Sequence, residues 1–288
     1  MSFVERLKNG WKIGWISLDI IRDNPALLLF VLMSGTSIIL ILLSFLSTIL
    51  VAVGISEFAN IALWFSEFEG NEILSALTLF FFYLIAFFTA IFFNIGLVYC
   101  TRQVFQGETV SIKEGLAYSV QKINVTLAWA ALAATVGTLL KMLEERLGFI
   151  GQLVIGLIGM VWSLATFFVV PILAFENIGP VDALKRSAMM MKKQWGEAIG
   201  ANFSFVAFYL LGYLAAIAYA VIMFMFHPLV AIIGAMVIIL LAHTAVSSAK
   251  TVFVTAAYQH LEGQSGGRFD EHAVLDRLFV PKKSKQRY

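Results

Sequence analysis

The chain has 288 residues, of which 60% are hydrophobic and 13% are charged. Soluble domains are typically about 45–50% apolar and about 25% charged, so this composition excludes an ordinary soluble protein and indicates a polytopic membrane protein. The formal net charge of +2 is too small to suggest binding to nucleic acid. Cys100 is the only cysteine, so no intramolecular disulfide can form, and we expect it to be a small buried hydrophobic residue.

Six apolar segments are long enough to cross a bilayer, since a spanning helix needs about 20 apolar residues. In chain order they cover about 26–55, 73–99, 125–143, 149–175, 198–226 and 229–249. The turns between the third and fourth segments and between the fifth and sixth are short, which favours antiparallel neighbours. The sequence therefore predicts an all-α polytopic membrane protein whose six transmembrane helices form three hairpins.

A shorter segment precedes each hairpin, with apolar residues at helical spacing and basic residues away from that stripe. The three segments cover 2–22, 111–123 and 176–197. This pattern is typical of an amphipathic helix that lies in the membrane interface. Asn24 and Ser111 are predicted N-caps, and the third interfacial helix is predicted to begin after the break at Gly179-Pro180.

The chain can be divided into three similar units, 2–99, 106–175 and 179–258, within one transmembrane domain that covers residues 1–258. Residues 259–288 are predicted to be a basic cytoplasmic tail. The units share a pattern and little identity. They indicate either an internal repeat or only the tendency of cytoplasmic loops to lie along the interface.

Lysine and arginine predict the orientation of these helices, because both are enriched in the cytoplasmic loops of membrane proteins. The two termini and the loops after the second and fourth spans carry 18 of the 20 basic residues. The opposite side carries only Lys141 and Arg146, and its one sizeable loop contains four glutamates. We therefore expect a multi-pass protein of the cell (cytoplasmic) membrane, with both termini and the three interfacial helices on the cytoplasmic side.

The sequence lacks the motifs of common enzyme classes. It contains no G-x-S-x-G, no H-E-x-x-H, no glycine-rich phosphate loop and no Cys/His spacing of a metal site. Glu144 and Glu145 are adjacent acids, but their position indicates a solvated outer turn. We therefore expect no catalytic residue, no metal, no cofactor and no enzymatic activity.

Polar residues within the spans are the better candidates for a site, because such residues in membrane helices are often functional. Four of them are predicted to lie at a similar depth towards the cytoplasmic leaflet: Asn94, Asn202, His243 and Ser247. They form either a polar pocket open to the cytoplasm or ordinary hydrogen bonds between neighbouring helices.

Four basic residues of the third interfacial segment are candidate contacts for anionic lipid: Lys185, Arg186, Lys192 and Lys193. Lysine and arginine near a negatively charged leaflet attract its headgroups. Anchoring on the cytoplasmic side predicts the same residues without any lipid site, so both interpretations stay open.

Several short stretches along the chain form a set of landmarks. They are Asn9-Gly10-Trp11, Phe92-Phe93-Asn94, Glu144-Glu145-Arg146, Val170-Pro171, Gly179 to Ser187, Trp195-Gly196-Glu197 and Asn202-Phe203. Over about residues 3–280 they resemble a family of uncharacterised six-helix prokaryotic integral membrane proteins, a domain of unknown function. The region 176–205 is also similar to the membrane domain attached to some glycerophosphodiester phosphodiesterases. Both resemblances imply a membrane fold, and neither implies an activity, since the chain contains no catalytic phosphodiesterase domain.

We expect a membrane protein that binds or organises lipid, or a partner, at the cytoplasmic leaflet. The expected partners are membrane lipids, and a membrane-protein partner or a second copy of the chain is a further option. The alternative is a transporter of a small solute or lipid, which would need a polar cavity reaching the middle of the bilayer.

Overall fold

The computed structural model describes residues 3–53, 72–271 and 275, although the side chains of 3–9, 48–53, 72, 149–150, 193–204 and 271 are outside this description. The described chain consists of helices and short connections, without strands. Six stretches of it are long and apolar enough to cross a membrane: Pro25–Ser47, Ile73–Phe105, Ile123–Arg146, Gly151–Phe175, Phe205–Phe224 and Pro228–Leu261. The prediction of an all-α membrane protein with six spanning helices is confirmed.

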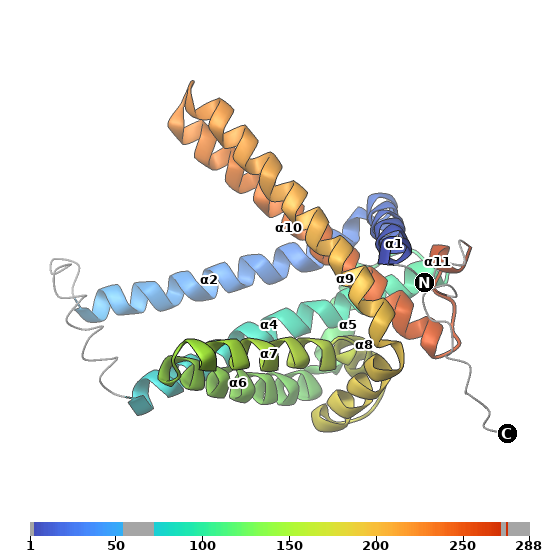
Figure 1. Cartoon of the computed structure of the whole chain (residues 1–288), viewed down its shortest axis with the longest axis horizontal. Helices are drawn as coiled ribbons and strands as arrows, with labels where there is room; N and C mark the ends of the chain where they lie inside the picture. The colour runs from blue at the N-terminus through green and yellow to red at the C-terminus, as the bar shows by residue number, and fades with distance from the viewer. Residues whose placement is uncertain (1–2, 54–71, 272–274, 276–288) are drawn as a thin grey trace.

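The second, third and fourth spanning helices lie side by side in one group, and the first spanning helix packs against the second (Figure 1). The turn η1 (Pro25–Leu27) leads directly into α2 (Leu28–Val53), which packs against α4 (Glu72–Phe105). The α4 helix packs mainly against α6 (Ile123–Arg146), although the two belong to different predicted hairpins. The predicted acidic outer loop, residues 56–72, falls almost entirely outside the described residues.

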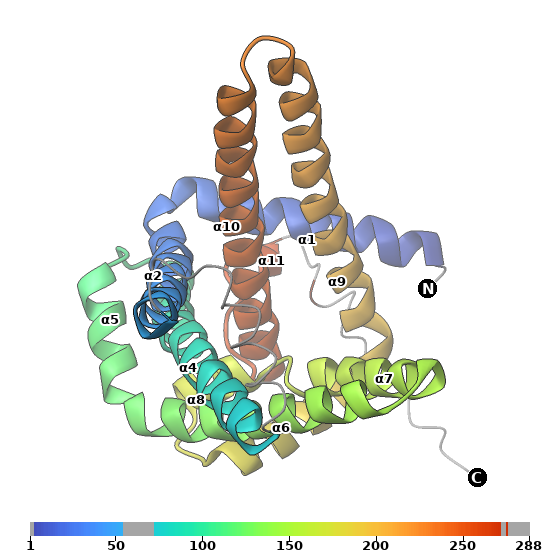
Figure 2. The same cartoon turned by 90° about the vertical axis from the view of Figure 1, so that its left-hand side faces the viewer.

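The last two spanning helices form a closely packed pair that leans away from the others. They are α9 (Pro180–Phe224) and α10 (Pro228–Leu261), joined by a short turn before Pro228. Figure 2 shows the end of this pair that carries the turn standing clear of the other helices. Since the three predicted hairpins pack so unequally, their arrangement as three equivalent units stays a prediction.

The three segments predicted to be interfacial lie around the end of the molecule where these groups meet. The α1 helix (Phe3–Asp23) packs against α9 and α10, and α5 (Ile112–Gln121) packs against α4. Each segment turns small residues to the core, and the serines that it places there are fully buried: Ser17, Ser119 and Ser187.

The apolar stripes predicted for these segments lie partly outside the core. Trp11 is 39% exposed, Val120 is 55% exposed and Val181 is 50% exposed. The segments therefore have a second apolar side that the protein itself does not cover. Their position within a membrane interface stays a prediction.

The fourth span is interrupted near its end, where the sequence suggested one continuous helix. It comprises α7 (Phe149–Ala165) and α8 (Val169–Phe175). Pro171 explains the interruption, because proline has no N–H and its ring clashes with the carbonyl of the preceding turn. The N–H of Phe168, at the interruption, donates to the hydroxyl of the buried Ser187 at 3.0 Å.

The helix starts follow the predicted residues in two cases out of three. The Ser111 hydroxyl accepts from the N–H of Glu114 at 3.3 Å, and Pro180 is the first residue of α9. Asn24 is a correction: its side chain makes no cap for η1, because its amide donates back to the carbonyl of Ile20 at the end of α1. The α9 helix also continues from its amphipathic part into the fifth span without interruption.

The described part of the C-terminal region packs against the body. The α10 helix passes residue 258 without a break, and the short helix α11 (Arg268–Glu271) follows it. Phe269 and Leu275 are both fully buried. A hydrogen bond from Arg268 lowers the pKa of Asp23, so these two residues tie α11 to α1. Most of the predicted basic tail, residues 276–288, lies outside the description.

Candidate functional site

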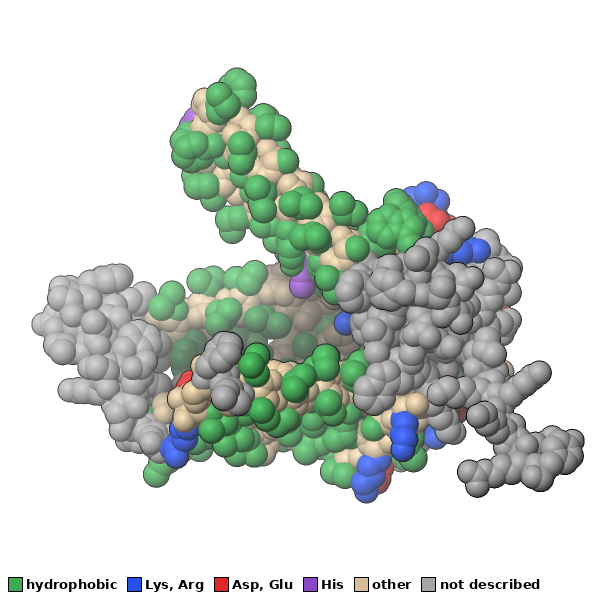
Figure 3. Space-filling view, in the orientation of Figure 1, with side chains coloured by type: hydrophobic (Ala, Val, Ile, Leu, Met, Phe, Trp, Pro, Cys, Tyr) green, Lys and Arg blue, Asp and Glu red, His purple; other side chains and the backbone are tan. Residues whose placement is uncertain are grey.

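A cleft opens where α10 separates from α2 and α4. Its volume is about 230 Å³. Figure 3 shows a hollow beneath the raised α9–α10 pair, with apolar side chains around it. The three helices each contribute side chains to its wall: Phe30, Val31, Ser34, Gly35 and Ile38 from α2, Ala90, Phe93 and Asn94 from α4, and Leu240, His243, Thr244 and Ser247 from α10.

One polar contact between α4 and α10, and two contacts within these helices, fix the polar side of the cleft. The Thr251 hydroxyl lies 3.2 Å from the Asn94 side-chain oxygen, and the Asn94 amide donates to the carbonyl of Ala90 at 3.0 Å. The same hydroxyl lies 3.2 Å from the carbonyl of Ser247. These contacts hold Asn94 in place and leave its partly exposed side chain at the wall of the cleft.

His243 comes four residues before Ser247 on α10, and its side chain is exposed. Its ring centroid is 5.6 Å from that of Tyr209 on α9, and Tyr209 also forms a side-chain hydrogen bond with Ser247. The aromatic ring of Tyr209 therefore supports the α10 side of the site from behind. No lysine, arginine or carboxylate is among the residues that line the cleft.

Three of the four residues predicted to share a polar pocket do line one cleft: Asn94, His243 and Ser247. Asn202 lies in α9, but its side chain is outside the described ones. Ser34 and Thr244 were not predicted. Serine and threonine are common in membrane helices, where they can bond to their own backbone, so sequence offered no signal that separates these two from the rest.

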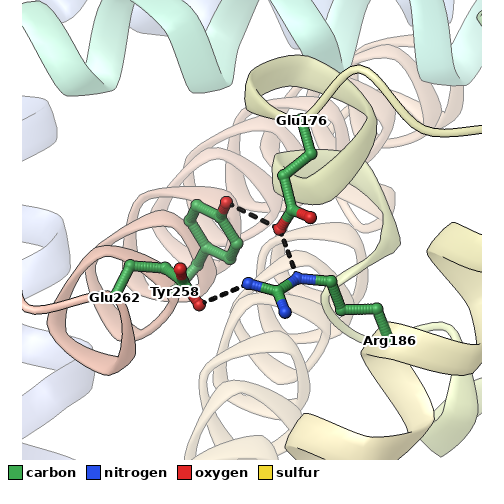
Figure 4. Close-up of polar contacts among 4 residues, drawn as sticks. All are labelled: Glu176, Arg186, Tyr258 and Glu262. Carbon is green, nitrogen blue, oxygen red and sulfur yellow. Dashed lines mark hydrogen bonds and ion pairs between the residues drawn. The ribbon is translucent and has the colours of Figure 1, made fainter.

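A second polar group joins three helices at the end of the bundle (Figure 4). Arg186 donates from Nε to Glu176 at 2.6 Å and from Nη2 to Glu262 at 2.8 Å. The Tyr258 hydroxyl donates to the same oxygen of Glu176 at 3.0 Å. The bond to Glu176 raises the pKa of Arg186 above its ordinary value, so the guanidinium stays charged.

The four predicted contacts for anionic lipid therefore have different surroundings. Arg186 is engaged by two carboxylates within the protein, and Lys185 lies 3.4 Å from Asp182 in an exposed pair. Lys192 is exposed, and the side chain of Lys193 is outside the described ones. Of the four, Lys192 is the described residue best placed to meet a ligand.

Residues 73–268 match the family described as "Family of unknown function (DUF6159)". This match covers well over half of the chain. The chain belongs to the DUF6159 family. No curated protein and no solved structure matches it. The similarity to the membrane domain of glycerophosphodiester phosphodiesterases stays a prediction.

The region shared with DUF6159 includes two of the three walls of the cleft. It contains nearly all of α4 and the whole of α10, together with the Arg186 group, and it leaves out α1 and α2. Within the described part of this DUF6159 protein, no group of three or more His, Cys, Asp or Glu side chains could hold a metal ion. What the cleft offers a ligand is a set of hydrogen-bonding groups, one of them an imidazole, between apolar walls.

Proposed function

We propose that this DUF6159 protein binds a membrane lipid without chemical conversion, with the lipid's polar region in the cleft between α2, α4 and α10. The observation that carries the proposal is the gathering of Asn94, His243 and Ser247 at one opening in an otherwise apolar surface. Polar side chains are costly in contact with hydrocarbon, so a polar ligand group beside them lowers that cost.

The cleft is large enough for part of a lipid molecule and too small for a whole one. Sites for small molecules typically measure about 300–1,000 Å³, whereas this cleft measures about 230 Å³. It accommodates a headgroup fragment or the glycerol and ester region. The acyl chains would then lie outside it, along the exposed apolar residues of α10, such as Leu240 and Leu241.

The chemistry of the cleft favours hydrogen bonding over ion pairing. Asparagine and serine both donate and accept, and histidine can do either according to its protonation. Ester carbonyls, hydroxyls and phosphate oxygens are all suitable partners for such groups. The cytoplasmic leaflet is proposed because the cleft lies towards the end of the molecule that carries most Lys and Arg in the described chain (Figure 3).

Native mass spectrometry of the protein extracted gently from membranes tests this function. We expect the wild-type protein to carry a bound lipid, and the variant His243→Leu with Ser34→Ala to retain about tenfold less. Hydrogen bonds within membranes contribute roughly 0.6–2 kcal/mol each, and two such losses correspond to about that factor. His227→Leu is the matched control, because His227 lies in the turn before α10 and does not line the cleft.

Two results would contradict the proposal. One is a wild-type protein free of lipid, above all if it drives lipid or solute flux in liposomes, since this would favour the alternative of a transporter. The other is equal loss of lipid from the His227→Leu control. A retained protein subunit in place of lipid would indicate that the chain organises a partner.

A further inference from the structure

A second hollow lies between the end of α7 and the first part of α9, away from the cleft. Its volume is about 290 Å³, and it shares no lining residue with the cleft. Five of its lining residues are apolar, and the sixth is a lysine: Val161, Leu164, Ala165, Ala188, Met191 and Lys192. We call this hollow the α7–α9 groove.

The apolar surface of the groove continues along α7 towards the opposite end of the bundle. Val154, Leu157 and Val161 are 49%, 59% and 56% exposed, and their spacing places them on one stripe of the helix. From Val154 to Ala165 this stripe is about 16 Å long at the ~1.5 Å rise of an α-helix. The hydrocarbon core of a bilayer is about 30 Å thick, so the stripe matches the depth of one leaflet.

Among the residues that line the groove, the charged one lies at the α9 side. Lys192 lies where the groove meets α9, and its side chain is exposed. Lys185 is seven residues earlier, so both lysines fall on the same side of α9. Lys185 has Asp182 as a partner at 3.4 Å. Lys192 forms no ion pair with a carboxylate of the described residues.

We propose that the α7–α9 groove holds an acyl chain of an anionic phospholipid, whose phosphate contacts Lys192. A path one leaflet deep, apolar along its length and cationic at one end, matches the shape and the charge of such a lipid. The site is independent of the cleft, since it involves other helices and a different chemistry. It gives one of the four candidate lysines and arginines a specific ligand and leaves Arg186 to its role within the protein.

Reconstitution into nanodiscs of phosphatidylcholine with a minority of phosphatidylglycerol tests the proposal. The lipids retained by the protein are counted by native mass spectrometry. We expect the wild-type protein to retain phosphatidylglycerol in preference to phosphatidylcholine. Lys192→Gln should reduce this preference about fivefold, the factor expected for one basic residue at a charged leaflet.

Three further variants make the result decisive. Lys192→Arg should keep the preference, because it keeps the charge. Lys141→Gln should also keep it, because Lys141 lies near the end of α6 that precedes the start of α7 and does not line the groove. Ala165→Leu should fill the groove and reduce the retention of both lipids at this site. An unchanged preference in Lys192→Gln, or an equal loss in Lys141→Gln, would overturn the proposal.

The cleft variant separates this site from the proposed function. His243→Leu with Ser34→Ala alters the cleft only, so its preference for phosphatidylglycerol should match that of the wild-type protein. A loss of that preference in the cleft variant alone would assign the anionic lipid to the cleft and contradict the groove.

Discussion

Phe30 links the cleft to the core of the protein. Its side chain is fully buried, yet it contributes to the cleft wall near the start of α2. Its ring also lies against Gly96 of α4 and Gly115 of α5, at a point where neither helix has room for a side chain. The geometry of the cleft therefore depends on two glycines that do not touch it.

Gly115→Ala should destabilise the protein. A Cβ atom there would lie 2.6 Å from Phe30 Cζ and 2.7 Å from the Cys100 sulfur, both in a closely packed region. Such overpacking typically costs about 1–3 kcal/mol. Thermal unfolding in detergent should show a lower midpoint for this variant.

Gly156→Ala is the matched control for this substitution. Gly156 lies in α7, and a Cβ atom there would meet nothing within 4 Å. Alanine is the better helix former by about 1 kcal/mol, so the midpoint should stay the same or rise. Equal destabilisation by both variants would contradict the close packing at Gly115.

At the scale of single residues, sequence predicted the members of the cleft that are rare in membrane helices. Asn94 and His243 stand out in apolar spans, whereas Ser34 and Thr244 do not. The Arg186 group could not be predicted, because Tyr258 and Glu176 are 82 residues apart in sequence. Nothing in the residues themselves shows that the ends of α8 and α10 meet.

Among the elements, α9 connects most of the features described above. Its first turns carry the buried Ser187, which supports the interruption between α7 and α8, and Arg186, which bridges to α8 and α10. Further along, it carries Tyr209 behind the cleft. A ligand in the α7–α9 groove would contact α9, whereas a ligand in the cleft would contact α10, which packs against α9.

Arg186→Gln should lower the stability of this junction. Hydrogen bonds to charged groups contribute roughly 1.5–3 kcal/mol each, and solvent reduces this where the groups are exposed, so we expect a total loss of about 2 kcal/mol. Glu176, whose side chain is 21% exposed, would lose its cationic partner. The midpoint of thermal unfolding in detergent measures the effect.

Lys185→Gln is the neighbouring control. Lys185 directly precedes Arg186 and forms an exposed pair with Asp182. Such exposed pairs contribute about 0–1 kcal/mol. The control should therefore leave the midpoint almost unchanged. If Arg186→Gln had as little effect, the group in Figure 4 would not stabilise the end of the bundle.

Sequence patterns predicted the interfacial segments and missed how they pack. The spacing of large apolar residues indicated one apolar stripe in each, but the buried residues are partly others: α1 buries Ile13, Ile16 and Ile20, and small residues such as Ser17, Ser119 and Ser187 are buried as well. Small residues allow helices to approach closely, and hydropathy gives them little weight. The internal repeat stays a prediction.

On the scale of the whole molecule, the six spans do not form one compact bundle. The α9–α10 pair leans away from the others (Figures 1 and 2). Most of its exposed large apolar side chains lie on the two stretches next to the connecting turn, 206–226 and 229–241. Such surface requires a lipid environment or a partner to cover it. The cleft opens because α10 leans away from α2 and α4.

The orientation of the molecule is tested with reporters. A reporter active only in the cytoplasm should be active when fused after Tyr288 and inactive when inserted after Glu67. The expectation follows from the basic residues at the end that carries α1 and the start of α9. A fusion after Tyr288 that is active only outside the cell would reverse the orientation and place the cleft in the opposite leaflet.

The most direct measurement for the central claim is photo-crosslinking with an uncharged glycerolipid that carries a diazirine next to its ester groups. The crosslinked peptides are then mapped by mass spectrometry. The proposed lipid site predicts crosslinks concentrated in residues 30–38, 90–94 and 240–247, and their loss in the variant His243→Leu with Ser34→Ala. Crosslinks spread evenly over the exposed faces of α9 and α10, with none at the cleft, would contradict it.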